Sequence, residues 1–498
     1  MSFNTATAPA VPAVDPKRWL ALVVIAIAQL MVVLDGTIVN IAMPSAQHAL
    51  DISDADRQWI VTAYTLAFGG LLLLGGRIAD YVGRRKIFLI GLIGFALASG
   101  LGGAATNAEM LFAARALQGA FGALLAPAAL SLITVTFTDV KDRAKAFGVF
   151  GAISGVGATI GLILGGLLTE YTTWRWTLLV NIPIALAAVA LALPIVRESR
   201  AEGDTKYDIP GTVLATGGLV ALVYGFTRAA EDSWTSGVTL ACFAVAAVLL
   251  VAFVVVEART KHPLLPLRVV LHRNRGGSFL VSVLLGAGMM GMFLFMTYYF
   301  QGTLQYSPLK SGVAYLPFSL ALVVTAIVGS SLLPKVGPRA MMSVGGAMST
   351  GAMIWLTQLR IDSSYLTLIL PAFVIMAIGM ALVFVPLGNT SLTGVDNHDA
   401  GVASAMVNTT QQVGGSLGVA LLNTVFTTAT ASYITDHGPE QAALGAVHGY
   451  NVAFTVSAVL LGASALLTFL LIRSDKRPAG GGTAESTDEA PTPVAVHV

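Results

Sequence analysis

Charged residues are scarce in this sequence of 498 residues. Lys, Arg, Asp and Glu together make up 11% of the chain, hydrophobic residues make up 55%, and the mean hydropathy is +0.78. Soluble domains carry about 25% charged residues. This chain therefore has too few polar side chains to enclose its apolar residues in water, and its composition predicts a membrane protein with many spans.

The residue types that build metal or redox sites are also scarce. Cys242 is the only cysteine, which excludes an intramolecular disulfide and a thiolate metal site. The His residues are scattered over loops and the C-terminal segment without a metal-binding spacing. No Gly-x-x-x-x-Gly-Lys-Ser/Thr phosphate loop occurs, and the net charge of +2 with no basic stripe argues against nucleic acid. We expect no metal and no cofactor.

Long apolar runs fill most of the chain. Runs of about 20 apolar residues can cross a bilayer as helices, and the first run is too long for a cleaved signal peptide. Assigning the loops alternately to two sides places most of the 28 Lys and Arg residues on the side of both termini, which predicts cytoplasmic termini. The fourteen predicted spans are 18–41, 58–78, 86–105, 109–134, 146–169, 175–196, 210–228, 237–256, 277–301, 312–333, 340–358, 365–388, 401–429 and 450–472.

Asp35 lies inside the first apolar run, far from the nearest charged residues, Arg18 and Asp51. A charged Asp at the centre of a bilayer costs about 2.5–3.5 kcal/mol on insertion scales. One interpretation is that Asp35 caps the end of the helix near the outer interface. We favour the other, in which its carboxyl group lies in a wet cavity and takes up and releases a proton.

Arg115 is the second charge inside a span. Asp35 and Arg115 each lie about six residues, or about 9 Å, from the expected outer end of their spans, so we expect them at similar depth. If the two spans adjoin, the charges would neutralise each other. The alternative role for Arg115 is structural, with its guanidinium donating to backbone carbonyl groups.

A glycine-rich basic turn separates the second and third spans. Its pattern Gly-x-x-x-Asp-x-x-Gly-Arg-Arg uses Gly76, Asp80, Gly83, Arg84 and Arg85. Glycines permit a tight turn, and the cations suit an anionic lipid surface. We favour a specific inner-side latch over ordinary positive charge on the inner loops. A weaker echo at 334–339 suggests an internal duplication.

The fifth span is rich in glycine, with Gly155, Gly161, Gly165 and Gly166 among its residues. Small residues four positions apart let two helices pack closely, and the excess of glycine also suggests a helix that bends or slides. Trp174-Arg175-Trp176 follows at the outer edge as an aromatic belt. Asn181 comes next, and we assign it mostly a structural role. Polar residues elsewhere are candidates for lining a cavity: Asn40, Gln118, Tyr298, Tyr299, Gln301, Asn389, Asn408 and Gln412.

In combination these motifs resemble the major facilitator superfamily and, within it, the fourteen-span drug:proton antiporters. The residues that carry the resemblance are Leu34-Asp35-x-Thr37-x-x-Asn40-x-Ala42-x-Pro44, the basic turn, Arg115-x-x-Gln118-Gly119, the glycine run, and Trp174-Arg175-Trp176 with Asn181-x-Pro183. The resemblance covers residues 18–472. It implies proton handling at Asp35, coupling at Arg115, and control of an inner gate by Asp80 and the basic turn.

The fold that the resemblance implies is an all-α membrane protein with 14 transmembrane helices, arranged as two six-helix bundles plus two extra helices between them. The expected parts are a flexible cytoplasmic N-terminus (1–17), an N-terminal bundle (18–197), two additional helices with a flanking loop (198–258), a C-terminal bundle (259–473) and a disordered cytoplasmic tail (474–498).

The function that the resemblance implies is proton-coupled efflux of lipophilic or amphipathic drugs across the bacterial inner membrane, by a monomer in contact with lipid and driven by the proton gradient. The first alternative is a proton-coupled transporter of a specific metabolite on the same fold. The second is a membrane-embedded enzyme or a sensor. The sequence offers no metal cluster or nucleophile pair for such an enzyme, so we expect no enzymatic activity.

Overall fold

The computed structural model describes residues 16–137, 139–200, 208–260, 263, 265, 267–392 and 400–473. These residues are helical, with short connections and no strand among them. The first part of the chain forms α1 (Arg18–Ala49), α2 (Trp59–Val82), α3 (Arg84–Gly103), α4 (Ala108–Thr136), α5 (Val140–Tyr171), α6 (Trp176–Leu179) and α7 (Asn181–Ile195). Two peripheral helices follow, α8 (Ile209–Glu231) and α9 (Gly237–Arg259).

The last part of the chain repeats this pattern of long helices. Its helices are α10 (Leu267–Val270), α11 (Arg273–Tyr298), η1 (Tyr299–Thr303), α12 (Pro308–Ala314), α13 (Leu316–Val336), α14 (Pro338–Leu356), η2 (Tyr365–Ile369), α15 (Leu370–Leu392), α16 (Ala400–His437), η3 (Pro439–Gln441) and α17 (Ala442–Leu471).

The helices are long and apolar enough for a membrane protein with many spans. Within the described residues, 11 helices could cross a bilayer, or up to 12 if the bent pair that forms α2, Trp59–Leu72 and Leu74–Val82, counts as one span. Each of the fourteen predicted spans overlaps a helix, but α14 is not among the helices that qualify, and α5 enters this comparison only with its apolar part Thr159–Tyr171, which is too short. The all-α membrane fold is confirmed, and the count of fourteen stays a prediction.

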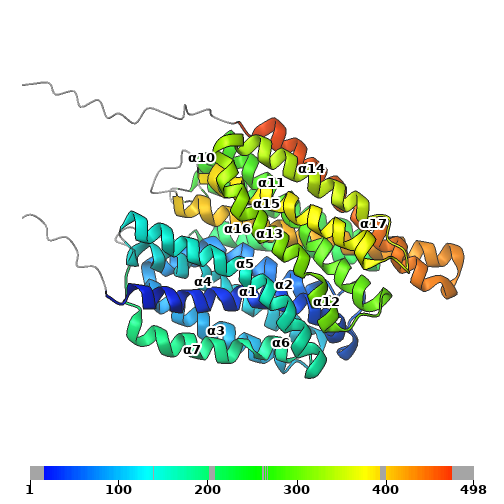
Figure 1. Cartoon of the computed structure of the whole chain (residues 1–498), viewed down its shortest axis with the longest axis horizontal. Coiled ribbons are helices and arrows are strands. Elements are labelled where there is room, and N and C mark those ends of the chain that lie inside the picture. The colour runs from blue at the N-terminus through cyan, green and yellow to red at the C-terminus, as the bar shows by residue number, and fades with distance from the viewer. Residues whose placement is uncertain are drawn as a thin grey trace, which may run out of the picture.

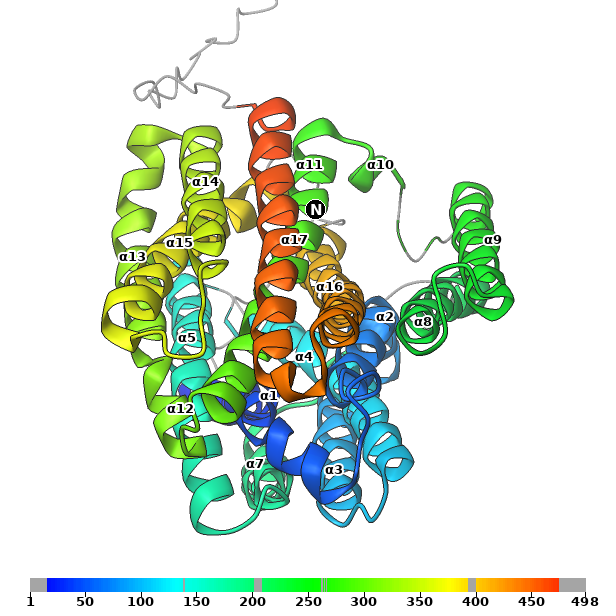
Figure 2. The same ribbon diagram turned by 90° about the vertical axis from the view of Figure 1, so that its right-hand side faces the viewer.

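The helices form two bundles, α1–α7 and α11–α17, which lie one above the other in Figure 1. The start of α1 and the end of α17 lie toward the same end of the molecule, which we call the inner end. The opposite end is the outer end. Figure 2 shows α8 and α9 as a pair at the edge of the two bundles, with α8 nearer to α2 and α16.

Helix α1 is longer than the sequence predicts and ends at Ala49 instead of 41. Pro44 lies inside this helix, and the chain turns only after Leu50, where Asp51 adopts a left-handed backbone with φ of 52°. Asp35 consequently lies near the middle of α1. The interpretation that Asp35 caps the end of its helix is therefore wrong.

The two bundles meet at their outer ends. Helix α5 packs on α12, and α2 packs on α16. Gly166 lies against the backbone of Leu309, and Gly312 lies against the carbonyl group of Leu162, so a side chain at either glycine would collide with backbone of the other bundle. Glu170 on α5 accepts a hydrogen bond from the backbone N–H of Leu309 at 2.9 Å. The outer end is closed by these contacts.

Helix α8 contacts both bundles near its outer end. Gln58, at the start of α2, donates to the hydroxyl of Thr227 on α8 at 2.7 Å. Thr424 on α16 donates to the carbonyl oxygen of Phe226, the residue before Thr227, at 2.8 Å. Consecutive residues of one peripheral helix are thus tied to opposite halves of the protein.

Candidate functional site

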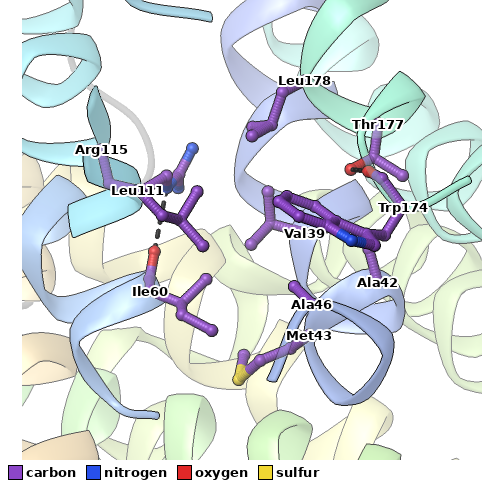
Figure 3. A pocket seen from close by; sticks show the side chains of 10 residues that line it. All are labelled: Val39, Ala42, Met43, Ala46, Ile60, Leu111, Arg115, Trp174, Thr177 and Leu178. Carbon is purple, nitrogen blue, oxygen red and sulfur yellow. Dashed lines mark hydrogen bonds between the residues drawn. The ribbon is translucent and has the colours of Figure 1, made fainter. Parts of the chain in front are cut away.

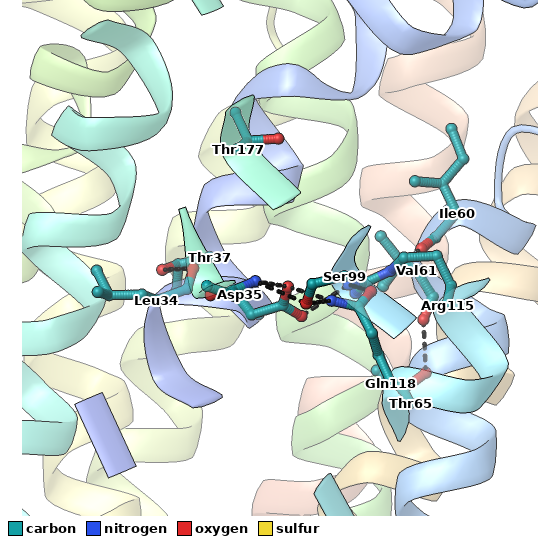
Figure 4. Close-up of polar contacts among 12 residues, drawn as sticks. Leu34, Asp35, Thr37, Ile60, Val61, Thr65, Ser99, Arg115, Gln118 and Thr177 are labelled. Atoms are coloured by element: carbon teal, nitrogen blue, oxygen red, sulfur yellow. Dashed lines mark hydrogen bonds and ion pairs between the residues drawn. The ribbon is translucent and has the colours of Figure 1, made fainter. Parts of the chain in front are cut away.

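A fully buried carboxylate lies in the N-terminal bundle. Asp35 has no exposed surface, and three side chains from other helices donate to it. The Nη1 atom of Arg115 lies 2.7 Å from Oδ2, while Gln118 and Asn181 donate to Oδ1 at 2.9 and 2.8 Å. Figure 4 shows this group between α1, α3 and α4. The sequence left open whether the first and fourth spans adjoin, and the structure brings Asp35 and Arg115 into contact.

Arg115 is held in place by more than the carboxylate. It is 1% exposed, and its Nε atom donates to the carbonyl oxygen of Ile60 on α2 at 2.9 Å. Its Nη1 atom also donates to Oε1 of Gln118, one helical turn further along α4, at 2.8 Å. The aromatic ring of Tyr64 lies 4.5 Å from the guanidinium carbon. Arg115 therefore makes the carbonyl contact of the structural alternative as well as the ion pair.

The donors around Asp35 offset the cost of burying its carboxyl group. Burial alone disfavours a charged carboxylate, whereas a nearby cation and hydrogen bonds to the oxygens favour it. The carboxyl group of Asp35 receives three donors, from Arg115, Gln118 and Asn181. The charges of the ion pair therefore cancel locally. Movement of Arg115 would leave a buried carboxylate without its counter-charge, and binding a proton would then neutralise it.

Two members of this group were missed or undervalued by sequence reasoning. Asn181 starts α7 and was assigned mostly a structural role, yet it contacts Asp35 directly. Ser99 on α3 accepts hydrogen bonds from Gln118 at 2.7 Å and from Asn181 at 3.3 Å. A serine in an apolar helix gives no signal in the sequence, whereas the polar Asn181 at a helix start was visible.

A small pocket lies beside Arg115, as Figure 3 shows. It is lined by apolar side chains of α1, α2, α4 and α6 and by Trp174, with Thr177 and Arg115 as its polar members. Arg115 therefore both lines this pocket and contacts Asp35.

The basic turn between α2 and α3 is fastened to the end of α7. Asp80 accepts a hydrogen bond from Arg84 at 2.8 Å, and Gly83 has φ of 129°, a conformation that favours glycine. The carboxylate of Glu198 accepts from the backbone N–H groups of Arg85 and Lys86, each at 3.1 Å. Glu198 was not predicted. The described latch therefore lies within the N-terminal bundle, and its role as a gate stays a prediction.

The glycines of α5 form two contact faces. Gly161 and Gly165 pack on α1 at Thr37 and Ile38, which agrees with close packing of small residues four positions apart. Gly166 faces α12 of the other bundle. The side-chain surroundings of Gly155 lie outside the described residues. The same helix thus packs against its own bundle and against the opposite one.

Three of the predicted cavity residues take part in contacts between the bundles. Tyr298 donates to Oε1 of Gln47, and Gln301 donates to the carbonyl oxygen of Ile41 at 2.9 Å. The side chain of Gln412 lies against Gly69 of α2. Tyr298 and Gln301 thus hold the outer ends together in this conformation.

The other candidates are dispersed. Asn40 donates to the carbonyl oxygen of Gly36 in its own helix at 3.1 Å, and the hydroxyl of Tyr299 donates to the carbonyl oxygen of Arg360. Asn408 is exposed, and the side chain of Asn389 lies outside the described residues. Only Gln118 joins the group around Asp35. The structure does not bring the set together around one cavity, and a role for these residues in binding substrate stays a prediction.

The described part of the chain contains no group of three or more His, Cys, Asp or Glu side chains that could hold a metal ion. Its chemistry is that of a buried ion pair with amide and hydroxyl neighbours. Such a group can exchange a proton and can respond to movement of the helices that carry it. It presents no nucleophile activated by a base.

Comparison with known proteins identifies the architecture. Residues 25–419 match the family model described as Major Facilitator Superfamily. Two solved structures each align with a TM-score of 0.66 at 18% identity: a bacterial homolog of the human lysosomal transporter Spinster in an inward-facing, unoccupied conformation, and an auto-inhibited peptide transporter of the POT family. They cover 92% and 93% of this chain, and 97% and 99% of their own.

Several curated proteins are similar over nearly the whole sequence. The puromycin resistance protein pur8 of Streptomyces alboniger is 51% identical over 484 residues, which is 96% of each chain. The cephamycin export protein CmcT of Amycolatopsis lactamdurans is 38% identical and covers 91% of this chain and 92% of its own. The multidrug transporter protein MdtP of Bacillus subtilis is 32% identical, with 84% and 77% covered.

Proposed function

Because this chain belongs to the Major Facilitator Superfamily, we propose that it exports lipophilic or amphipathic antibiotics across the bacterial inner membrane in exchange for protons. Relatives that cover most of the chain carry names of antibiotic resistance or export proteins. The proposal includes cytoplasmic termini, function as a monomer in contact with lipid, and no enzymatic activity. Puromycin is the first compound to test, given the 51% identity to a puromycin resistance protein.

The contact between Asp35 and Arg115 carries the proposal of proton coupling. In the closed arrangement of the outer end, the guanidinium lies 2.7 Å from the carboxylate, and the pair is neutral. Movement of α4 relative to α1 would withdraw Arg115, after which the carboxylate would take a proton from water. Return of Arg115 would expel that proton. Each proton transfer is therefore linked to a rearrangement of the helices that carry the two residues.

Alternation of access follows from the contacts at the outer end. For the outer ends of the two bundles to part, the contacts of Gly166, Gly312, Tyr298 and Gln301 across the bundles have to break. Uptake of a proton at Asp35 alters the packing of α1, and the outer half of α1 contributes Ile41 and Gln47 to these contacts. Helix α1 thus offers a direct mechanical link between the proton site and the outer closure.

Transport by everted membrane vesicles tests the proposal. Addition of puromycin to energised vesicles should release protons from the wild-type vesicle lumen, and Asp35→Asn should abolish this release while the protein still folds as a monodisperse species in detergent. The matched control is Asp436→Asn, which removes an exposed acid near the outer end of α16. Unchanged proton movement in Asp35→Asn would overturn the assignment of Asp35.

The alternative is transport of one specific metabolite on the same fold. The polar residues near the outer closure are mostly neutral and do not indicate a cationic cargo. They are compatible with a drug exporter and with a transporter of one metabolite. A panel of unrelated amphipathic antibiotics separates the two proposals. Competition among several of them for export supports a drug exporter, whereas transport of a single compound supports the alternative.

A further inference from the structure

Two buried carboxyl groups meet at the inner end of the peripheral helices, far from Asp35 along the chain. Asp208 directly precedes α8, and Glu257 lies in the last turn of α9. The short connection between these helices makes them antiparallel, so the start of α8 lies beside the end of α9. Asp208 is 6% exposed and Glu257 is 3% exposed.

Each carboxyl group uses one oxygen on a backbone N–H group. Oδ1 of Asp208 accepts from Gly211 at 2.8 Å and so caps the start of α8. Oε2 of Glu257 accepts from Leu265 at 2.9 Å. Leu265 belongs to a small apolar cluster with Phe279 of α11 and Met406 of α16. Glu257 therefore links α9, through Leu265, to the C-terminal bundle.

The remaining oxygens have no hydrogen-bond partner and face the same point. Oδ2 of Asp208 and Oε1 of Glu257 are both buried and unpartnered. A Cβ atom placed on Gly211 would lie 2.6 Å from each of them, so they can be separated by no more than twice that distance. The two carboxyl groups are within hydrogen-bonding range of each other.

Two ionised carboxylates in this position would repel each other strongly, since both are removed from water and neither free oxygen has a donor. Arg268 of α10, the described basic residue nearest to Leu265 along the chain, is exposed. The nearest basic residue along α9, Arg259, is exposed and is two positions away, a spacing that places side chains on different faces of a helix. One proton between the two oxygens would satisfy both.

We propose that Asp208 and Glu257 together bind one proton, taken from water on the inner side, as a second proton site distinct from Asp35. The proton forms an O–H bond with one carboxyl group and a hydrogen bond to the other, which leaves the pair with one negative charge. In this state the pair holds the start of α8, the end of α9 and Leu265 together. Loss of the proton leaves two negative charges, which separate and release Leu265 from Glu257.

The number of protons released by the purified full-length protein tests the proposal. The protein, weakly buffered in detergent with a pH indicator dye, is shifted stepwise to alkaline pH from a starting pH at which exposed carboxyl groups are already ionised. Glu257→Gln and Asp208→Asn should each release one proton fewer per chain than the wild type, because one carboxyl group remains ionised throughout. Glu440→Gln, which alters an exposed acid at the outer end, serves as the control at alkaline pH and should match the wild type.

The unfolding temperature provides a readout of the same bound proton. The folded protein holds a proton that the unfolded chain releases, so this part of the stability is present at low pH and is lost as the pH rises. In Glu257→Gln the N–H of the side-chain amide can donate to Oδ2 of Asp208, so no proton from water is needed to join the two side chains. The variant should therefore fold, and its unfolding temperature should lose this pH dependence. Asp208→Asn provides the same arrangement with the roles exchanged.

Two results would overturn the proposal. One is identical proton release and identical pH dependence of unfolding in the wild type and both amide variants. The other is a wild-type unfolding temperature that falls with EDTA and recovers with Mg²⁺ or Ca²⁺, which would show that the two carboxylates hold a divalent cation instead. Repeating the titration in an Asp35→Asn background separates this site from the proposed transport site, because the difference of one proton should persist there.

Discussion

Arg57, in the turn before α2, donates a hydrogen bond from Nε to Oδ1 of Asn423 on α16 at 3.0 Å, and this contact joins the two bundles at their outer ends. Arg57 is 2% exposed, and its guanidinium carbon lies 4.1 Å from the ring of Tyr298 and 4.7 Å from that of Phe426. The amide of Asn423 donates in return to the carbonyl oxygen of Asp54 at 2.9 Å. The closure is thus built from a cation, two aromatic rings and an amide.

Asn423→Ala should weaken the outer closure. The substitution leaves Nε of Arg57 buried without its acceptor, and loss of a hydrogen bond to a charged group costs about 1.5–3 kcal/mol. Spin-label distances between the outer ends of α2 and α16 should therefore show a larger outward-open population. Thr435→Ala removes only a bond from an exposed hydroxyl within α16 and should leave the distances as in the wild type. A distance distribution unchanged in Asn423→Ala would count against this role.

Asp35→Asn should lower the stability of the N-terminal bundle. Removing one partner of a buried ion pair leaves the other charge uncompensated, and the free energy of unfolding is expected to fall by about 3–5 kcal/mol. The double variant Asp35→Asn/Arg115→Gln removes both charges and should lose less than the sum of the two single variants. Thermal unfolding of the wild type, the two single variants and the double variant in one detergent measures this coupling. Additive losses would show that the ion pair has no coupling energy.

Gly165→Ala should disturb the packing of α5 on α1. A methyl group there would lie 2.8 Å from the carbonyl oxygen of Ile38, and backbone cannot move aside as a side chain can. The added atoms should lower the unfolding temperature and the rate of export. Gly36→Ala is the matched control on α1, because nothing lies within 4 Å of its added methyl group. Equal behaviour of the two variants would contradict the proposed close approach.

Glu198→Ala should loosen the start of α3. Its carboxylate accepts from the backbone N–H groups of Arg85 and Lys86, and loss of a cap at the start of a helix costs about 0.5–2 kcal/mol. Amide hydrogen exchange should accelerate at these two residues and remain unchanged at the opposite end of α3. If exchange at Arg85 and Lys86 keeps the wild-type rate, Glu198 does not cap the helix in solution.

The sequence predicted the fold well because a bilayer demands long apolar helices, and such runs are visible without any knowledge of contacts. It also identified Asp35 and Arg115, since a charge inside an apolar run is conspicuous. Their contact could be predicted only on the condition that the two spans adjoin, because spacing along the chain sets depth and does not reveal which helices are neighbours. The predicted end of α1 was short by eight residues because the polar segment after Ala42 reads as a loop, although it continues the helix.

The partners that complete each site were harder to find. Ser99 and Glu198 act through contacts between helices distant in the chain, and neither residue departs from an ordinary sequence context. The cavity candidates were chosen for polarity alone. In this conformation the side chains of Tyr298 and Gln301 form their hydrogen bonds with α1 in the outer closure. Polarity marks residues that need partners, but whether the partner is a ligand or another helix depends on the packing.

The position of α8 has a consequence for inhibition. Thr227 is bonded to Gln58 of one bundle, and the carbonyl group of Phe226 is bonded to Thr424 of the other. When the bundles rock apart, α8 can follow only one of them and has to give up its bond to the other. A hydrophobic compound that wedges beside α8 from the surrounding lipid would therefore arrest the cycle without competing for the cargo site, and raising the cargo concentration would not relieve the block.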